Sequence, residues 1–266
     1  GVGGFALHLA AADRRVHGVE ISVEAVEAAR QAAAMRSRTA AIRSAMDAEE
    51  EAGEEAVMTL PDGYSDAAHA LWDAATALNR RAGAVSLPPL LFFTDPARTP
   101  RPWETAARLP PGAAVVFRAF GRPDALEIGR RLRAATRRAG VCLLVGLDVD
   151  LAQALEADGL HLPETSADRA PTVRVARPGW LLTAAWHGES APPEGLDALV
   201  LSPVFPAGGA SAAKPSLGVA GFRARAEEAG APVYALGGVT AANVRELEYS
   251  GACGVAGVGA IQDAFA

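Results

Sequence analysis

Short apolar runs recur along the chain from residue 88 onward, and polar or glycine-rich segments separate them. Eight such runs cover residues 89–95, 113–120, 141–148, 159–164, 180–187, 198–205, 233–238 and 254–261. Runs of this length without polar alternation are typical of strands that are buried on both faces of a parallel sheet. The pattern therefore predicts eight buried, parallel strands.

Segments with helical periodicity lie between most of these runs. They cover residues 124–140, 150–159, 218–230 and 240–251. In the last segment we expect Thr240 as the N-cap and Gly251 as the stop. Alternating strands and helices indicate the α/β class, and eight units within about 178 residues predict a compact (β/α)8 TIM barrel. The connections at residues 165–177 and 188–196 look poorly helical, so we expect degenerate units there.

The chain before residue 88 has a different pattern. Residues 1–87 are rich in alanine and charged side chains and end in GAVSLPP, which we interpret as a linker. We therefore expect an Ala-rich, mainly helical N-terminal extension at residues 1–87 and a barrel at residues 88–266. Residues 22–56 are strongly helix-prone, with Ser22 placed as an N-cap. The acidic run at residues 49–55 is either a solvated helix face or a disordered tether.

A second helix is expected closer to the barrel, at residues 64–83. Its apolar stripe contains Ala68, Leu71, Trp72 and Leu78. Gly83 follows as the stop, since glycine often ends a helix. The spacing predicts an amphipathic helix.

Composition and charge narrow the classes of function. Of the 266 residues, 50% are hydrophobic and 6% aromatic, so the core is built largely from alanine, valine and leucine. The formal net charge of −6 argues against a nucleic-acid partner, which favours a basic face. No apolar run reaches the roughly 18 residues of a membrane span, and no signal peptide is visible, so we expect no membrane partner and a cytoplasmic location. The oligomeric state stays open, with a homo-oligomer as one alternative.

The two cysteines both lie inside apolar runs. We therefore expect Cys142 and Cys253 to be reduced thiols of the core. A disulfide or a metal-binding pair is the alternative.

Glycines end the last two predicted strands. Gly237 and Gly238 close the seventh run, and Gly259 lies near the end of the eighth. Phosphate groups commonly bind after strands seven and eight of a TIM barrel. Glycine exposes backbone N–H groups without a Cβ, and a helix starting at Thr240 would add partial positive charge. We predict a phosphate site at these glycines; the alternative is that they only permit tight turns.

Few other polar residues lie at the predicted strand ends. They are Arg118, Asp148, Asp150, His161, Glu164, His187 and Ser202. We count Ser202 among the expected substrate-binding residues. Lys214, in the loop PAGGASAAKPS, either closes over a phosphate or is a solvated lysine. His187 is either catalytic or a packed neutral histidine, whereas His161, between two leucines, is expected to be structural.

Several longer motifs carry a family resemblance. They are ALEADGLHLPE, LSPVFP with a following lysine, ALGGVTAANVRELEYSGACGVAGVGAI and the early FFTD. Residues 89–266 thereby resemble thiamine phosphate synthase and its TenI relatives, which are TIM barrels of thiamine biosynthesis. The resemblance implies a transferase that joins hydroxymethylpyrimidine diphosphate to thiazole phosphate and releases pyrophosphate, with Mg²⁺ neutralising the leaving group. The TenI branch includes a thiazole tautomerase, which moves a proton on thiazole phosphate.

The resemblance also implies roles for individual residues. Arg118 and Lys214 match residues that bind the diphosphate, and Lys214 is in addition an expected catalytic residue. Gly238 and Gly259 match the thiazole-phosphate cradle. His187 matches the histidine of the strand-five S-x-H signature and is the other expected catalytic residue.

The match is incomplete at the diphosphate and metal end. The second cation of strand two reads Phe120, the Asn-Asp pair after strand three reads Gly146–Leu147, and the aspartate of the G-Q-x-D signature reads Ser166. Asp148 is therefore the expected Mg²⁺ ligand, with Glu164 as the alternative.

Three functions agree with these residues. The first is a thiamine phosphate synthase-type transferase, which we favour. The second is a TenI-like tautomerase with His187 as general acid and base, which needs no metal. The third is a non-catalytic barrel that binds a phosphorylated ligand.

The first residues of the chain carry a separate resemblance. The sequence GVGGFALHLAAADRRVHGVEIS is similar to the cofactor loop of an S-adenosylmethionine-dependent RNA methyltransferase, with Gly1, Gly3 and Gly4 before a helix and Glu20 after a strand. The strand that should precede the glycines is absent, and no later strands of that fold follow. We therefore interpret the segment as a truncated remnant or a fusion scar.

Overall fold

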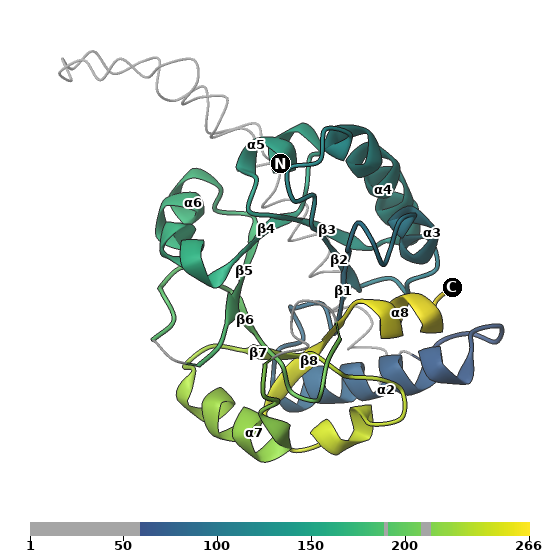
Figure 1. Cartoon of the computed structure of the whole chain (residues 1–266), viewed down its shortest axis with the longest axis vertical. Coiled ribbons are helices and arrows are strands. Elements are labelled where there is room, and N and C mark those ends of the chain that lie inside the picture. Colours follow the sequence, from purple (N-terminus) through teal and green to yellow (C-terminus); the bar gives the residue numbers. More distant parts are fainter. Residues whose placement is uncertain (1–58, 189–190, 209–213) are drawn as a thin grey trace, which may run out of the picture. The chain divides into compact units, whose positions relative to one another are not determined.

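The computed structural model describes residues 59–188, 191–208 and 214–266. Within these residues, eight parallel strands form one closed barrel in chain order, as predicted (Figure 1). They are β1 (Leu90–Phe93), β2 (Ala114–Phe117), β3 (Cys142–Gly146), β4 (Gly159–Leu162), β5 (Leu181–Trp186), β6 (Ala198–Leu201), β7 (Val233–Leu236) and β8 (Ala252–Gly257). The barrel closes where β8 pairs with β1, with Leu91 opposite Ala256.

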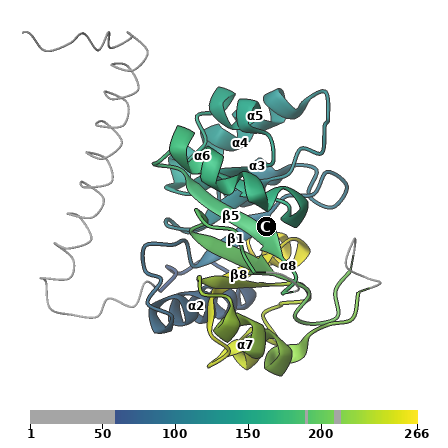
Figure 2. The ribbon, with the colours of Figure 1, turned by 90° about the vertical axis from the view of Figure 1, so that its left-hand side faces the viewer.

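Helices surround the barrel (Figure 1). They are α2 (Asp66–Arg81), α3 (Pro102–Ala106), α4 (Ala125–Ala139), α5 (Val149–Ala154), η1 (Glu164–Arg169), α6 (Ala170–Ala176), α7 (Gly218–Glu228), η3 (Val244–Leu247) and α8 (Gly259–Ala264). Helices α4 and α5 lie on the opposite side of the barrel from α2 and α7 (Figure 2). Gly140 ends α4 in a left-handed conformation, as expected for a glycine C-cap.

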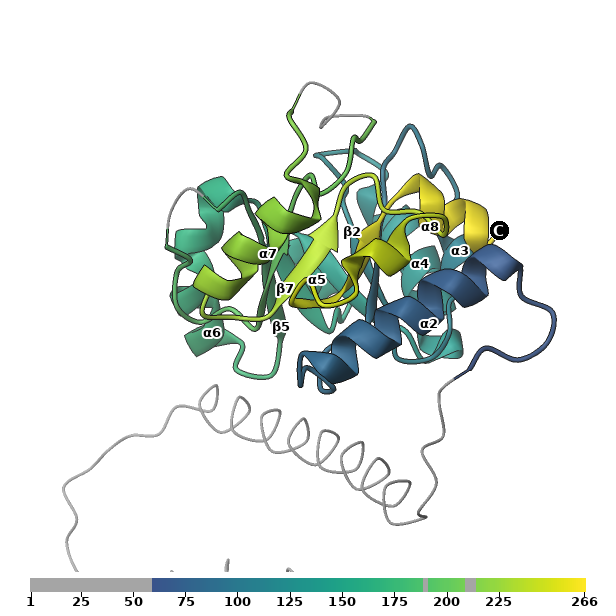
Figure 3. The ribbon, with the colours of Figure 1, turned by 90° about the horizontal axis from the view of Figure 1, so that it is seen from below.

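Helix α2 confirms the predicted amphipathic helix and packs against the outside of β8. Ser65 is its N-cap and also donates a hydrogen bond of 2.8 Å to the carbonyl of Ala264, the last residue of α8. Helices α2 and α8 lie side by side (Figure 3). All four predicted stripe residues are buried: Ala68, Leu71, Trp72 and Leu78. The described residues before position 88 therefore share the core of the barrel. The division of the whole chain at residue 88 stays a prediction, because residues 1–58 lie outside the described residues.

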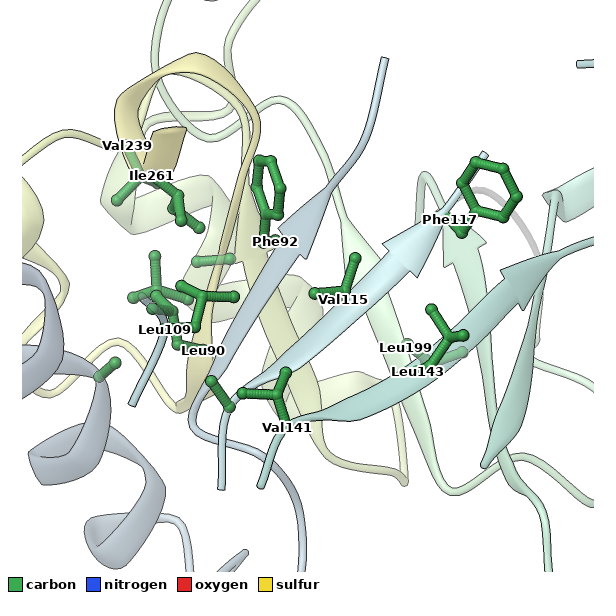
Figure 4. Packing of buried hydrophobic residues seen from close by; sticks show 14 of the residues in the cluster. Leu90, Phe92, Leu109, Val115, Phe117, Val141, Leu143, Leu199, Val239 and Ile261 are labelled. Carbon is green, nitrogen blue, oxygen red and sulfur yellow. The ribbon is translucent and has the colours of Figure 1, made fainter. Parts of the chain in front are cut away.

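The core has two layers, because side chains of successive strand residues point to opposite faces. The outer layer lies between strands and helices; Figure 4 shows Leu90, Phe92, Val115, Phe117 and Leu143 in it. The inner layer fills the barrel and contains Leu91, Phe93, Val116, Leu144, Tyr234 and Cys253. The Tyr234 hydroxyl donates to the carbonyl of Pro88, 2.6 Å away, at the end of the barrel where the strands begin. The packed interior leaves chemistry to the loops at the other end.

One predicted helix is wrong. Residues 240–251 form turns and the short η3 in place of an α-helix with Thr240 as its N-cap. The Asn243 side chain accepts a hydrogen bond from the backbone N–H of Thr240 and donates one to the carbonyl of Gly238. These bonds hold the chain in a turn at the position where the helix was expected to start, since an asparagine side chain competes with the helical backbone pattern.

The two poorly helical connections differ from each other. Residues 165–177 do form helical structure, in η1 and α6. The described residues between β5 and β6 form no helix. Of these two connections, only the one after β5 is therefore degenerate in its described residues.

Both cysteines are free, as predicted. Burial raises the pKa of Cys142 to about 11 and that of Cys253 to about 12, so both remain thiols at neutral pH. In the described part of the chain, no helix is long and apolar enough to cross a membrane. The helix predicted at residues 22–56 and the methyltransferase-like opening lie outside that part.

Candidate functional site

The predicted site residues lie at one end of the barrel, where the strands end. The strands are parallel, so the residues that follow each strand meet at a common rim. His187 follows β5, Ser202 follows β6, and Gly237 follows β7. Arg118 follows β2, and Gly259 begins α8 after β8. The sequence therefore placed these five residues at the correct end of the fold.

Three polar side chains form a chain of contacts at the ends of β4, β5 and β6. Glu164 accepts hydrogen bonds from the backbone N–H of His187 at 3.0 Å and contacts the His187 ring through Nδ1. On the other side of the ring, Lys214 Nζ lies 2.9 Å from Nε2 of His187. About 30% of each of the Glu164 and His187 side chains is exposed, 32% and 29% respectively, so the pair can be reached from solvent. The site therefore holds a carboxylate, an imidazole and an ammonium in series.

The barrel geometry explains why Glu164 and His187 meet. β4 pairs with β5 in register, with Leu162 opposite Ala184. Pro163 has an extended backbone and turns the chain into η1, which begins at Glu164. This places the Glu164 carboxylate beside the residue that follows β5. The pairing was not expected from the sequence, because it depends on this turn.

The composition of the sequence sets Lys214 apart from the other basic residues. It is the only lysine among the 266 residues, and every other basic side chain except histidine is arginine. Its contact with His187 supports a specific role.

Arg118 lies in the predicted position, and its side chain is held by the protein. Its Nε donates to the carbonyl of Thr94 at 2.7 Å, and its Nη2 lies 3.9 Å from the Asp95 carboxylate. The guanidinium also stacks against the rings of Phe93 and Phe120, 5.4 and 5.3 Å from their centroids. Burial lowers the pKa of Arg118 from its usual value, while Asp95 opposes this shift.

A second arginine at the rim was missed by the sequence reasoning. Arg98, in the loop after β1, places Nη2 3.4 Å from the position that a Cβ on Gly259 would occupy. Its positive charge also contributes to the lowered pKa of Arg118. The Asp95 side chain fixes this loop by accepting hydrogen bonds from the N–H groups of Ala97 and Arg98. A basic residue three positions after the aspartate of FFTD was the available signal.

The glycines after β7 are required by packing. Gly237 and Gly238 have φ of +97° and +66°, which disfavours other residues. A Cβ would lie 2.7 Å from Pro203 Cα at Gly237 and 2.5 Å from the Pro206 carbonyl oxygen at Gly238. Gly237 and Gly238 therefore do permit a tight turn, as the alternative prediction stated.

The backbone N–H groups of this turn are nevertheless available. The Gly237 and Gly238 carbonyls accept hydrogen bonds from Phe205 and Asn243. Within the described residues, the N–H groups of Gly237, Gly238 and Gly259 donate to no protein acceptor. Backbone N–H groups in turns with left-handed residues are suited to bind anions. The turn thus keeps its carbonyls paired and its donors free.

Ser202 lies in the middle of this region. It follows β6 directly and is half-buried. Because Leu201 is opposite Ala235 in the sheet, Ser202 comes next to the end of β7. The role of Ser202 as a substrate-binding residue stays a prediction.

Asp148 does not lie in a group of metal ligands. It is exposed, and its side chain caps α5 by accepting a hydrogen bond of 2.8 Å from the N–H of Leu151. The alternative ligand, Glu164, uses both carboxylate oxygens on His187. In the described part of the chain, no three His, Cys, Asp or Glu residues are grouped where they could hold a metal ion together. Mg²⁺ usually takes only one or two carboxylates together with substrate phosphates, so the Mg²⁺ role of Asp148 stays a prediction, which its capping bond to α5 does not support.

His161 confirms its predicted structural role. It is 7% exposed and points into the barrel, where Nδ1 lies 2.9 Å from Thr183 Oγ1 and the ring meets Phe93 edge to face. Burial, aided by the charge of Arg118, lowers its pKa from 6.5 to about 3. His161 is therefore a neutral core residue near neutral pH.

Comparison with known proteins gives consistent matches for the barrel. Residues 97–261 match a family model described as thiamine monophosphate synthase. A putative thiamine-phosphate synthase of Geobacter sulfurreducens is 36% identical over 51% of this chain and 66% of its own length. The putative thiamine-phosphate synthase 2 of Aquifex aeolicus is 34% identical over 50% of this chain and 72% of its own length. The matched part thus spans about two thirds of these relatives.

A solved structure has the same fold. It is the thiamine phosphate pyrophosphorylase from Pyrococcus furiosus, with a TM-score of 0.55 and 26% sequence identity. The similarity covers 66% of this chain and 91% of that protein. The comparison agrees with the closed eight-stranded barrel described above.

Proposed function

The chain belongs to the thiamine monophosphate synthase family, and from this we propose that it joins hydroxymethylpyrimidine diphosphate to thiazole phosphate. The names of its homologues support a place in thiamine biosynthesis. The observation that supports the proposal is the set of groups at the rim of the barrel where the strands end. It combines free backbone donors at Gly237, Gly238 and Gly259 with cationic side chains at the same ends of the strands.

The phosphate of the thiazole would bind at the ends of β7 and β8. The free N–H groups of Gly237, Gly238 and Gly259 can donate to its oxygens, and the missing Cβ at Gly259, which only Arg98 among the described residues approaches, lets the phosphate come close to the backbone. Arg98, beside Gly259, supplies a positive charge there. Hydrogen bonds from N–H groups to a phosphate are charge-assisted and therefore strong.

The diphosphate would be held by cations on the other loops. In the reaction the bond between the pyrimidine methylene carbon and a diphosphate oxygen breaks, and the electron pair leaves with pyrophosphate. The thiazole nitrogen forms the new bond to that carbon. Arg118 and Lys214 would stabilise the negative charge that gathers on the leaving group, since such electrostatic stabilisation is usually the largest catalytic contribution.

Incubation of the full chain with both substrates and magnesium tests this proposal. We expect thiamine phosphate and pyrophosphate in equal amounts by mass spectrometry, with none in reactions lacking protein or either substrate. A protein that binds thiazole phosphate by calorimetry but forms no thiamine phosphate contradicts the proposal. That outcome would favour one of the other two functions.

A second function is favoured by the contact between Glu164, His187 and Lys214. A TenI-like tautomerase removes a proton from one thiazole carbon and returns it to another, and histidine is suited to both steps near neutral pH. The His187 ring is fixed by a carboxylate on one side and an ammonium on the other. Incubation with thiazole phosphate alone, followed by NMR of the thiazole protons, distinguishes this activity from the condensation.

A further inference from the structure

Glu164 makes two different contacts with one residue. Oε1 accepts a hydrogen bond from the backbone N–H of His187, and Oε2 contacts Nδ1 of its ring. The first contact fixes the main chain of His187, and the second fixes the rotation of its side chain. The main chain and the ring of His187 are thus both oriented by a single carboxylate.

The three groups also restrict which nitrogen of His187 carries a proton. A carboxylate can only accept a hydrogen bond and an ammonium can only donate one. Nδ1 faces the Glu164 carboxylate, so it must be the donor. Nε2 faces the Lys214 ammonium, so in the neutral ring it must be the acceptor.

We propose that Glu164 is a positioning residue that holds neutral His187 in the tautomer with the proton on Nδ1. The lone pair of Nε2 then faces the rim of the barrel on the side of Lys214, where a substrate proton can be taken up. Glu164 itself does not contact the reacting atoms. The proposal rests on the proposed function only for its effect on turnover, because the tautomer is a property of the free protein.

The surroundings of the pair are consistent with this role. Neither Glu164 nor His187 has another charged partner among the described residues besides Lys214. Glu164 lines a cavity of about 230 Å³, whose other walls include the apolar side chains of Ala167, Ala184 and Trp186. Asp168 is the other carboxylate on this cavity. A pair that served only to join β5 to η1 would not need Lys214 on the far side of the ring.

The ¹⁵N chemical shifts of the His187 ring in the full chain test the proposal. Spectra are recorded at about pH 8.5, where an ordinary histidine is neutral. We expect the wild-type protein to show a protonated Nδ1 and an unprotonated Nε2. Glu164→Gln keeps the size of the side chain but can both donate and accept. Because the Lys214 ammonium also keeps Nε2 unprotonated, the substitution is made in a Lys214→Met background, where it should raise the population of the Nε2–H tautomer above that of Lys214→Met alone. His187→Gln assigns the signal, and Glu227→Gln, on the exposed face of α7, is the matched control.

Glu164→Gln alone gives a kinetic readout. For thiazole phosphate isomerisation, we expect Glu164→Gln to lower kcat at least about 10-fold with KM changed less than about twofold, since general acid–base catalysis depends on the orientation of the base. Glu164→Asp, which retains the carboxylate, should recover part of kcat. Identical tautomer populations in Lys214→Met and in the double variant Lys214→Met with Glu164→Gln would overturn the proposal. A tautomer change without any turnover would leave it standing and contradict the tautomerase function instead.

Discussion

Replacement of Lys214 by alanine is expected to lower kcat/KM for the condensation about 10²–10³-fold, the usual effect of removing one group that stabilises transition-state charge. Lys214 is the only lysine in the chain and lies at the rim, 2.9 Å from His187. Its ammonium can follow the departing pyrophosphate, because it sits on a loop and carries three rotatable donors.

The measurement is a steady-state assay of thiamine phosphate formation by the full chain. Lys214→Arg keeps the charge and should recover part of the rate, whereas Arg223→Ala, on the exposed face of α7, serves as the control and should match the wild type. Because Lys214 is the only lysine, an amine reagent labels only Lys214 and the N-terminus, so the accessibility of Lys214 can be measured directly. A Lys214→Ala variant with less than about a twofold change in kcat/KM contradicts the assigned role.

The second large effect concerns the stability of the fold in acid. His161 has a pKa of about 3 in the folded barrel and about 6.5 when unfolded, so the unfolded chain binds the proton more tightly. Its contribution to stability is therefore fully present above about pH 6.5 and is lost progressively as the pH falls toward 3. Between pH 6.5 and 4.5 this residue alone should reduce the free energy of unfolding by about 2 kcal/mol.

Urea unfolding at a series of pH values measures this effect. His161→Gln can still hydrogen-bond to Thr183 and contact Phe93, but it has no proton to gain. Other groups titrate equally in both proteins, so the difference between the two pH profiles isolates His161. The profile of His161→Gln should be flatter below pH 6.5. Parallel profiles would mean that His161 is protonated inside the barrel.

The strands could be predicted because burial on both faces leaves an unbroken apolar run. The inner and outer layers, for example Leu91 and Leu90, both require apolar side chains, so the pattern survives without tertiary information. The helix expected after Thr240 failed for the opposite reason. Its local pattern is helical, but the Asn243 side chain accepts a hydrogen bond from the Thr240 N–H and donates one to the Gly238 carbonyl, and these bonds hold a turn that spacing alone does not reveal.

The positions of the site residues at the strand ends could be predicted from the sequence, but the contacts between their side chains could not. Arg118, His187 and Gly259 follow strands, so the parallel topology alone puts them at one rim. Which side chains meet depends on loop conformation, and neither the bond from Glu164 to His187 nor the approach of Arg98 to Gly259 can be read from spacing. Asp148 shows the same limit, since an acid after a strand serves either as a ligand or, as here, as a helix cap.

The proposed function depends on the binding of a phosphate ester by free backbone donors at the ends of β7 and β8. Calorimetric titration of thiazole phosphate into wild type and Gly259→Asp tests it most directly. Apart from the local backbone, Arg98 Nη2 is the only atom of the described residues within 4 Å of a Cβ on Gly259, so the variant should fold, while its carboxylate repels phosphate and pairs with Arg98. Ala107→Asp, an exposed position before β2 at the other end of the barrel, is the matched control. We expect Gly259→Asp to weaken binding at least about 10-fold, since like charges disfavour each other at contact distance, and Ala107→Asp to leave it unchanged. Equal affinity of all three proteins for thiazole phosphate would contradict this expectation.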